Sequence, residues 1–148
     1  MVTSKNRVDC AFCAIGRGDD VAAEIVCTGA LWVAFFPLEP ATPGHTLIIP
    51  RDHVLDLWAA ETELAAELMR VVVTVGAAIQ RAVRPEGMNL ITSAGSTAEQ
   101  SVFHLHLHVV PRWGHDGFGE IWPRGPRYED EALLEGIADR IRSACTAV

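Results

Sequence analysis

The sequence predicts an α+β fold built on an antiparallel sheet. Strand-like segments come in runs, and only one long helical pattern interrupts them, between the third and the fourth strand. This arrangement is typical of α+β domains. With 148 residues, of which 49% are hydrophobic, the chain is long and apolar enough to bury a core of its own. We therefore expect a single domain over residues 1–148.

The first part of the chain predicts a short helix followed by three strands. The polar start leads into a helical turn that Gly16 and Gly18 end, and the first two strands are joined at Thr28-Gly29-Ala30, a hairpin signal. The loop before the third strand contains three prolines, which remove backbone donors. The helix and the three strands are predicted over residues 9–20, 24–28, 31–36 and 45–50.

One long amphipathic helix is predicted over residues 61–83. Its apolar residues recur at helical spacing, and Pro85 and Gly87 mark its end. The apolar positions are Leu64, Ala65, Leu68, Val71, Val72, Val75, Ile79 and Val83.

The rest of the chain predicts two more strands and a C-terminal helix. The helix begins with acidic residues and carries arginines near its end, which favours it through the helix dipole. The strands are expected over residues 88–93 and 101–111, and the helix over residues 128–145. Residues 8–112 would then hold the core motifs, and residues 113–148 would form a C-terminal loop and helix.

Charge and hydropathy exclude several classes of protein. The net charge is −7 and Lys5 is the single lysine, which argues against a nucleic acid polymer as partner, because such binding depends on many cation–phosphate contacts. The longest apolar run, residues 71–79, is too short to cross a membrane, and the polar N-terminus lacks a signal-peptide core. We expect a cytoplasmic protein that does not enter membranes.

Three histidines, His104, His106 and His108, alternate with apolar residues in the segment FHLHLHVVPRW. On a strand they would share one face, with Phe103, Leu105, Leu107 and Val109 on the other. A single histidine on a strand is usually solvent-facing or hydrogen-bonded, but three buried imidazoles in a row are costly unless each has a partner. The face is therefore expected to hold a ligand, by binding a metal or by attacking an electrophile and moving protons.

Two further features leave alternatives open. The small polar loop 95–101 ends in Gln100 and Ser101, so it is either an anion cradle or a plain surface turn. Cys10 and Cys13 form a Cys-x-x-Cys pair that fits a redox pair, half a zinc site or two buried thiols. The absence of a β-α-β pattern after the pair weakens the redox alternative.

The segment QSVFHLHLHVV resembles the H-φ-H-φ-H-φ-φ signature, with φ apolar, of the histidine triad (HIT) superfamily. CAFC near the start, PGHTL leading into IIPRDH, and GHDGFGEIW after the triad resemble the bacterial zinc-containing branch along nearly the whole chain. The resemblance implies a five-stranded antiparallel sheet with helices and a homodimer. It also implies hydrolysis or transfer of a nucleoside monophosphate group, with a purine nucleoside phosphate as the expected substrate.

The resemblance also implies a role for each site residue. His106 would be the nucleophile on the α-phosphorus, Ser101 would serve the leaving group, and His108, His45 and Gln100 would hold phosphate oxygens or the leaving atom. Trp122 would approach the substrate site of the partner subunit. A structural Zn²⁺ would be bound by Cys10, Cys13, His53 and His104, in a closed shell with no open position for catalysis. Cys27, Cys145 and His115 are left without a functional role.

The chain departs from the family pattern at three positions. Pro37 stands where many relatives place a side chain that binds ribose, and proline offers neither a donor nor a side-chain acceptor. Ser93 replaces an asparagine often found before the glycine of the anion loop, and Glu99 replaces the glycine before Gln100. A carboxylate there would repel phosphate unless it points away or meets a cation, for which Arg51 and Arg112 are candidates.

Three functions are compatible with this sequence. The first is a zinc-containing phosphohydrolase or nucleotidyl transferase that acts on nucleoside phosphoramidates or related conjugates through a phosphohistidine intermediate. The second is hydrolysis of dinucleoside polyphosphates. The third is a nucleotide-binding interaction protein with vestigial activity.

Overall fold

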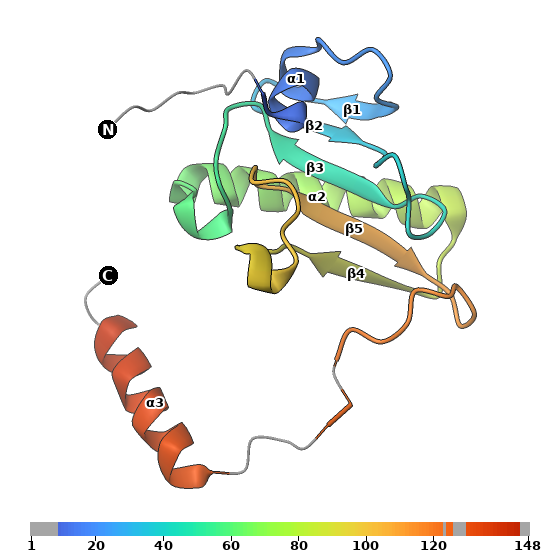
Figure 1. The fold of residues 1–148 in the computed structure, drawn as a ribbon. Coiled ribbons are helices and arrows are strands. Elements are labelled where there is room, and N and C mark those ends of the chain that lie inside the picture. The colour runs from blue at the N-terminus through green and yellow to red at the C-terminus, as the bar shows by residue number, and fades with distance from the viewer. Residues whose placement is uncertain (1–8, 123, 126–129, 146–148) are drawn as a thin grey trace. The chain divides into compact units, whose positions relative to one another are not determined.

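A five-stranded antiparallel sheet forms the centre of the structure, a computed structural model that describes residues 9–122, 124–125 and 130–145 (Figure 1). Its order is β1-β2-β3-β5-β4, so β4 lies at an edge and β5 between β3 and β4. The strands are β1 (Ile25–Thr28), β2 (Trp32–Phe35), β3 (Thr46–Pro50), β4 (Gly87–Ile91) and β5 (Leu107–Arg112). The predicted α+β class with an antiparallel sheet is confirmed.

The predicted hairpin joins β1 to β2 through Gly29. The Gly29 N–H donates to the carbonyl of Trp32 at 3.0 Å. A Cβ on Gly29 would lie 2.4 Å from the indole nitrogen of Trp32, so any larger residue at this position would force the Trp32 side chain to move.

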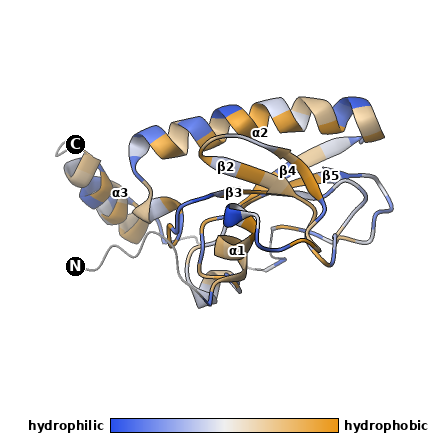
Figure 2. Ribbon diagram, turned by 90° about the horizontal axis from the view of Figure 1, so that it is seen from above, coloured by the Kyte–Doolittle hydropathy of each residue, from blue (hydrophilic) through white to orange (hydrophobic). Residues whose placement is uncertain are grey.

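Two helices cover opposite faces of the sheet (Figure 2). α2 (Thr62–Val83) buries Leu68, Val71, Val75 and Ile79 against one face, and α1 (Ala11–Arg17) lies on the other. The long helix is thus confirmed almost to the residue, because its apolar stripe is the side that packs.

The middle strands supply both faces because their side chains alternate. On the α2 side the sheet contributes Ala34, Ile48, Leu107 and Val109 to the core, and Leu105, just before β5, joins them. On the α1 side a smaller cluster gathers Ile15 of α1 with residues of β2 and β3, namely Val33, Phe35, Leu47 and Ile49. Since α1 has only seven residues, it covers only part of its face, and the functional site lies beside it.

The last strand is shorter than predicted. β5 begins at Leu107, and the chain bends over residues 102–104, where the His104 N–H donates to the carbonyl of Val102. The Leu105 N–H is bound by the Val54 carbonyl, outside the sheet. Leu105, Leu107 and Val109 face the core as expected, but Phe103 is 47% exposed, because the bend takes it off that face.

The chain divides into two compact units, Met1–Phe118 and Gly119–Val148. The second contains α3 (Glu131–Cys145), which Asp130 caps by accepting from the Leu133 N–H. The predicted start of this helix at residue 128 lies outside the described residues. No helix in the described part of the chain is both long and apolar enough to span a membrane.

Candidate functional site

Four side chains distant in sequence meet where α1 approaches the end of β3. The thiols of Cys10 and Cys13 and the imidazoles of His53 and His104 offer ligand atoms that all lie within 4.8 Å of one another. The Sγ atoms of Cys10 and Cys13 lie 3.5 Å from His104 Nδ1, and Cys13 Sγ lies 3.4 Å from His53 Nδ1. A tetrahedral zinc shell with two sulfurs and two nitrogens has S···N edges of about 3.6 Å.

Burial and a hydrogen bond prepare His104 to bind a metal. His104 is fully buried, and burial lowers its pKa to about 4, so the ring is neutral at pH 7. Its Nε2–H donates to the Pro50 carbonyl at 2.9 Å, which leaves Nδ1 unprotonated and aimed at the thiols. Donor types, spacing and tautomer all fit zinc, and the predicted ligands are brought together.

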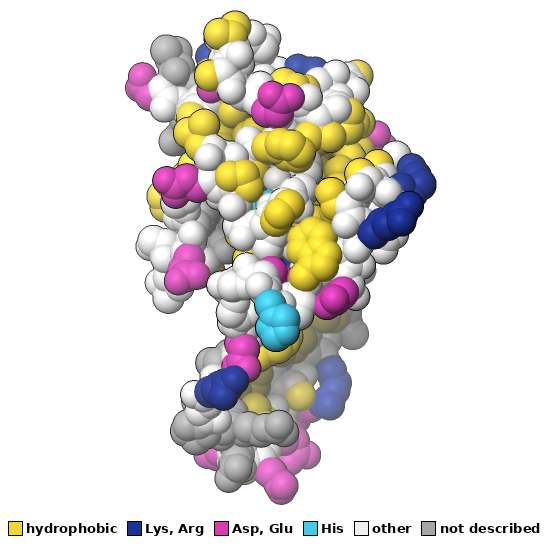
Figure 3. All heavy atoms as spheres, turned by 90° about the vertical axis from the view of Figure 1, so that its right-hand side faces the viewer, with side chains coloured by type: hydrophobic (Ala, Val, Ile, Leu, Met, Phe, Trp, Pro, Cys, Tyr) yellow, Lys and Arg dark blue, Asp and Glu magenta, His cyan; other side chains and the backbone are white. Residues whose placement is uncertain are grey.

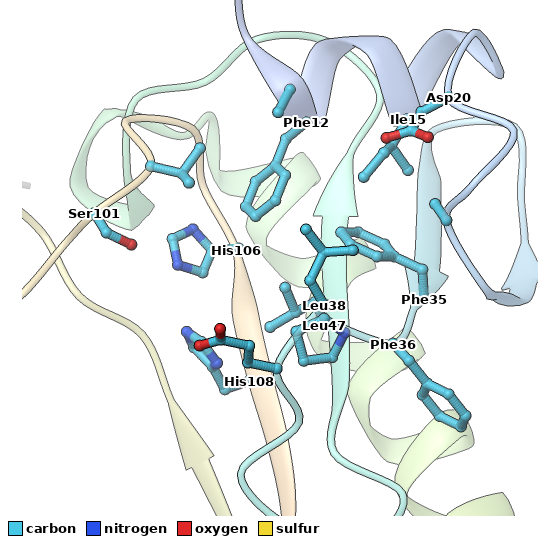
Figure 4. Close-up of a pocket in the computed structure, with 15 residues that line it drawn as sticks. Phe12, Ile15, Asp20, Phe35, Phe36, Leu38, Leu47, Ser101, His106 and His108 are labelled. Atoms are coloured by element: carbon cyan, nitrogen blue, oxygen red, sulfur yellow. The ribbon is translucent and has the colours of Figure 1, made fainter.

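A pocket of about 430 Å³ opens beside this cluster, a size typical of small-ligand sites. His106, His108 and Ser101 lie on one side of it, and aromatic and aliphatic side chains from α1, β2 and β3 lie on the other (Figure 4). Apolar side chains also gather on the molecular surface at the end of the sheet that carries residues 36–45 (Figure 3). The apolar lining is formed by Ala11, Phe12, Ile15, Ala23, Phe35, Phe36, Pro37, Leu38, Leu47 and Val102.

His106 is held in the tautomer that a nucleophile requires. Its Nδ1–H donates to the carbonyl of His104 at 2.7 Å, so the lone pair is on Nε2. Burial lowers the pKa of His106, which keeps the ring neutral. Figure 4 shows the ring between Phe12, Ser101 and His108. A neutral imidazole with a free nitrogen can attack an electrophile without first losing a proton.

His45 and His108 form a chain of hydrogen bonds that ends in the pocket. The Ala41 N–H donates to His45 Nδ1 at 3.0 Å, so the proton of neutral His45 is on Nε2. That Nε2–H donates to His108 Nδ1 at 2.9 Å, which places the His108 proton on its own Nε2. Burial, His106 and His45 together lower the pKa of His108 to about 4. His106 therefore offers a lone pair while its neighbour His108 offers an N–H.

Of the other residues predicted to bind substrate, some line the pocket and some do not. Ser101 lines the pocket beside His106, but Gln100 and Ser93 do not line it. The Gln100 amide accepts from the Gly95 N–H and donates to the Leu55 carbonyl, both at 2.8 Å. It therefore fixes loop 95–100, and its contact with substrate stays a prediction, as does that of Ser93. Trp122 is 83% exposed and belongs to the second unit, so its predicted role also stays untested.

One departure from the family pattern, Glu99, is exposed to solvent. Glu99 has φ of 64°, a left-handed conformation that favours glycine. The two arginines suggested to compensate for its charge have other partners, and compensation stays a prediction. Arg51 binds the carbonyls of Gly16 and Gly29, and Arg112 binds Asp116 and Asn89.

Sequence reasoning missed several residues that shape the site. The ring of Phe12 packs edge-on against His106 at 5.2 Å between centroids, and the Thr92 hydroxyl donates to the His106 carbonyl at 3.0 Å. Phe12 could have been found, because it lies between two cysteines expected to bind the same metal as His104. Asp20 and Glu39 also line the pocket, and none of the described lining residues is Lys or Arg.

Comparison with known proteins agrees with this geometry. Residues 19–115, well over half of the chain, match the model of the HIT domain. The chain belongs to the HIT family. It is 37% identical to the Bacillus subtilis protein named Protein hit, over 92% of this chain and 97% of that protein. It is 33% identical to adenosine 5′-monophosphoramidase hnt1 of Schizosaccharomyces pombe, over 91% of this chain and all of that protein.

Solved HIT structures share the fold. A crystal structure from Streptococcus mutans UA159 superposes with a TM-score of 0.87 at 32% identity, covering 96% of this chain and 88% of that one. A Zn-bound histidine triad family protein from Mycobacterium smegmatis has a TM-score of 0.70 at 33% identity, covering 92% and 97%. The predicted family is confirmed.

Proposed function

We propose that this HIT protein cleaves nucleoside phosphoramidates or related nucleotidyl conjugates at the α-phosphate, through a covalent intermediate on His106. The observation that carries the proposal is the pair of opposite tautomers, with a free lone pair on His106 Nε2 and an N–H on His108 Nε2. Such a pair suits attack on phosphorus by one ring and stabilisation of a phosphoryl oxygen by the other.

In the first step, His106 Nε2 forms a bond to the α-phosphorus while the bond from phosphorus to the leaving nitrogen breaks. The electron pair goes to the leaving amine, which takes a proton from the Ser101 hydroxyl as that hydroxyl takes one from solvent water, so Ser101 stays neutral. The Nε2–H of His108 donates a hydrogen bond to a non-bridging oxygen. In the second step, a water molecule attacks phosphorus and loses its proton to solvent, the P–Nε2 bond breaks with its electron pair returning to Nε2, and the nucleoside monophosphate leaves with His106 neutral again.

The lining of the pocket favours a substrate with little negative charge. Two carboxylates, Asp20 and Glu39, line it, and Lys and Arg are absent from its described lining. A phosphoramidate monoester carries about one negative charge, whereas a polyphosphate chain carries several that this lining does not neutralise. The apolar wall formed by Phe12, Phe35 and Leu38 suits a nucleobase, in line with the activity named for the Schizosaccharomyces pombe relative.

We also propose that the chain is a homodimer and that Cys10, Cys13, His53 and His104 hold a structural Zn²⁺. When bound, a zinc ion with two thiolates and two imidazoles has a closed shell, so it cross-links the chain and contributes no Lewis acid to the reaction. Its part is to fasten α1 to the sheet beside the pocket.

A substrate panel with mass spectrometry tests the function. Adenosine and guanosine phosphoramidates and diadenosine polyphosphates are incubated with the protein, and rapidly quenched samples are digested to locate a nucleotidyl adduct. We expect P–N cleavage to be faster and the adduct to lie on His106. Faster cleavage of the polyphosphates would favour the second enzyme class. Nucleotide binding without turnover of any substrate would favour an interaction protein.

A further inference from the structure

The metal centre and the pocket share one residue, Phe12. It lies between Cys10 and Cys13 in the sequence, and it lines the pocket. The centroid of its ring is 6.0 Å from that of His104 and 5.2 Å from that of His106, edge-on in both cases. Figure 4 shows the ring of Phe12 beside that of His106. Any displacement of the two cysteines therefore displaces a wall of the pocket.

The helix that carries Phe12 is too short to hold its own position. α1 has seven residues, whereas isolated helices shorter than about 12 residues are marginal in water. No side chain in the described chain caps its N-terminus. That end is held by the cluster of Cys10 and Cys13 with His53 and His104, and by the ring of Phe12, which packs edge-on against Phe35 with 5.6 Å between centroids.

The opposite end of α1 is held independently of the metal ligands. The Arg51 guanidinium donates to the Gly16 carbonyl, and Ile15 is buried in the cluster with Val33 and Leu47. Without metal, the Phe12 end keeps its packing on Phe35 but loses the cross-link through Cys10 and Cys13, so it is the end that loosens more.

We propose that metal binding and nucleotide binding are thermodynamically coupled, with Phe12 as the residue that transmits the coupling. This inference rests on the proposed nucleotide function. Metal at the four ligands holds Phe12 in the pocket wall, so nucleotide binds to a preformed surface. By linkage, nucleotide must raise the affinity for metal by the same factor.

The coupling acts on binding more than on the chemical step. His106 is held by the Thr92 hydroxyl and by the carbonyl of His104, and His104 is anchored without metal through its hydrogen bond to the Pro50 carbonyl. Loss of metal should therefore raise Kd and KM for the nucleotide, while kcat per folded molecule changes less.

The experiment measures both halves of the linkage. Calorimetry gives the Kd of AMP for zinc-loaded protein, for chelator-stripped protein and for the single-ligand variant His53→Ala, and circular dichroism verifies folding. Competition with a chromogenic chelator gives the zinc Kd with and without saturating AMP. We expect zinc to lower the Kd of AMP about tenfold and saturating AMP to lower the Kd of zinc by the same factor, which is within the range usual for coupled sites.

Two phenylalanine variants separate the coupling from simple loss of pocket surface. Phe36 also lines the pocket but lies outside the metal-binding segments. Phe36→Ala should weaken AMP binding and keep the zinc dependence. Phe12→Ala should weaken AMP binding and abolish the dependence while retaining zinc.

The possible results separate the zinc–nucleotide coupling from the proposed nucleotide function. Equal AMP affinity with and without zinc, or coupling that persists undiminished in Phe12→Ala, would overturn the inference. The latter result would mean that zinc acts through global folding. Failure of AMP and GMP to bind zinc-loaded wild-type protein would overturn the proposed function and the coupling with it.

Discussion

His106 and His108 are two residues apart, yet their hydrogen bonds give them opposite chemical roles. The Nδ1–H of His106 donates to the His104 carbonyl, so its Nε2 has a free lone pair. His108 Nδ1 accepts from His45, so the proton of His108 is on Nε2 and can be donated to a ligand in the pocket. Replacing His106 and replacing His108 should therefore impair different steps of the reaction.

His106→Asn is expected to abolish the covalent adduct and turnover, because it removes the attacking nitrogen and no metal ligand. Zinc content and the circular dichroism spectrum should stay unchanged. His108→Ala should still form the adduct but react about 10²–10³-fold more slowly, as when one transition-state donor is lost. An adduct trapped on His108, or near-normal turnover in His106→Asn, would contradict the assignment.

His45 acts through His108, so the effect of replacing His45 on kcat should depend on whether the new side chain can still donate a hydrogen bond to His108. His45→Ala leaves His108 Nδ1 without its donor and should lower kcat by about one to two orders of magnitude, as loss of a group that orients a functional histidine does. His45→Gln offers an amide N–H in place of Nε2–H and should recover part of kcat. Equal kcat values for the two variants would show that the relay is unimportant.

Acid should destabilise the protein partly through His108. Its pKa in the folded state is about 4, below the ordinary 6.5, chiefly because it is buried. Between these values the unfolded chain binds the proton first, so stability is full above pH 6.5 and declines toward pH 4. Urea unfolding midpoints across this range should fall less steeply in His108→Gln than in wild-type protein. A parallel decline in both would assign the effect to other groups.

At the scale of elements, α1 is the part whose position is expected to depend most on the proposed zinc ion. Purified protein from metal-replete medium should contain about one zinc per chain, and the Cys10→Ser, Cys13→Ser double variant should lack it. The double variant should unfold at lower urea because metal binding adds directly to folding free energy. Elemental analysis yielding less than about a tenth of an equivalent in wild-type protein, or equal metal in the variant, would refute the site.

At the scale of the whole molecule, the edge of the sheet offers a surface for a second copy. β4 is an edge strand with Leu90 45% exposed, and it lies beside α2, since a Cβ added to Gly76 of α2 would be 3.7 Å from Met88 Cε of β4. Near Gly76, Met69 and Val73 of α2 are 43% and 67% exposed. Exposed apolar residues beside an unpaired strand are typical of an interface.

Light scattering at micromolar concentration should therefore detect a dimer of the 16.1 kDa chain. Val73→Asp should shift it toward monomer, because it brings a charge into the contact. Val21→Asp is the matched control, since Val21 is 97% exposed and lies away from β4 and α2. A wild-type protein that is only monomeric would refute the dimer, and equal effects of the two variants would refute the interface.

The sequence by itself determined the sheet, the long helix and part of the candidate site. These depend on local periodicity and on motif spacing: apolar residues at helical spacing produced α2, and alternation sent Leu105, Leu107 and Val109 to the core. The motif likewise named His106, which lines the pocket, and the four side chains proposed to bind zinc, which the structure brings together.

Only the tertiary structure decided which hydrogen bonds and packing contacts each of these residues makes. The bend before β5, the use of Gln100 and Arg51 to hold loops, and the relay from Ala41 through His45 depend on contacts between segments far apart in sequence. A hydrogen-bond partner fixes which nitrogen of a histidine carries the proton, and no local pattern encodes that partner. Phe12 became a pocket wall for the same reason, because only folding brings α1 against the histidines.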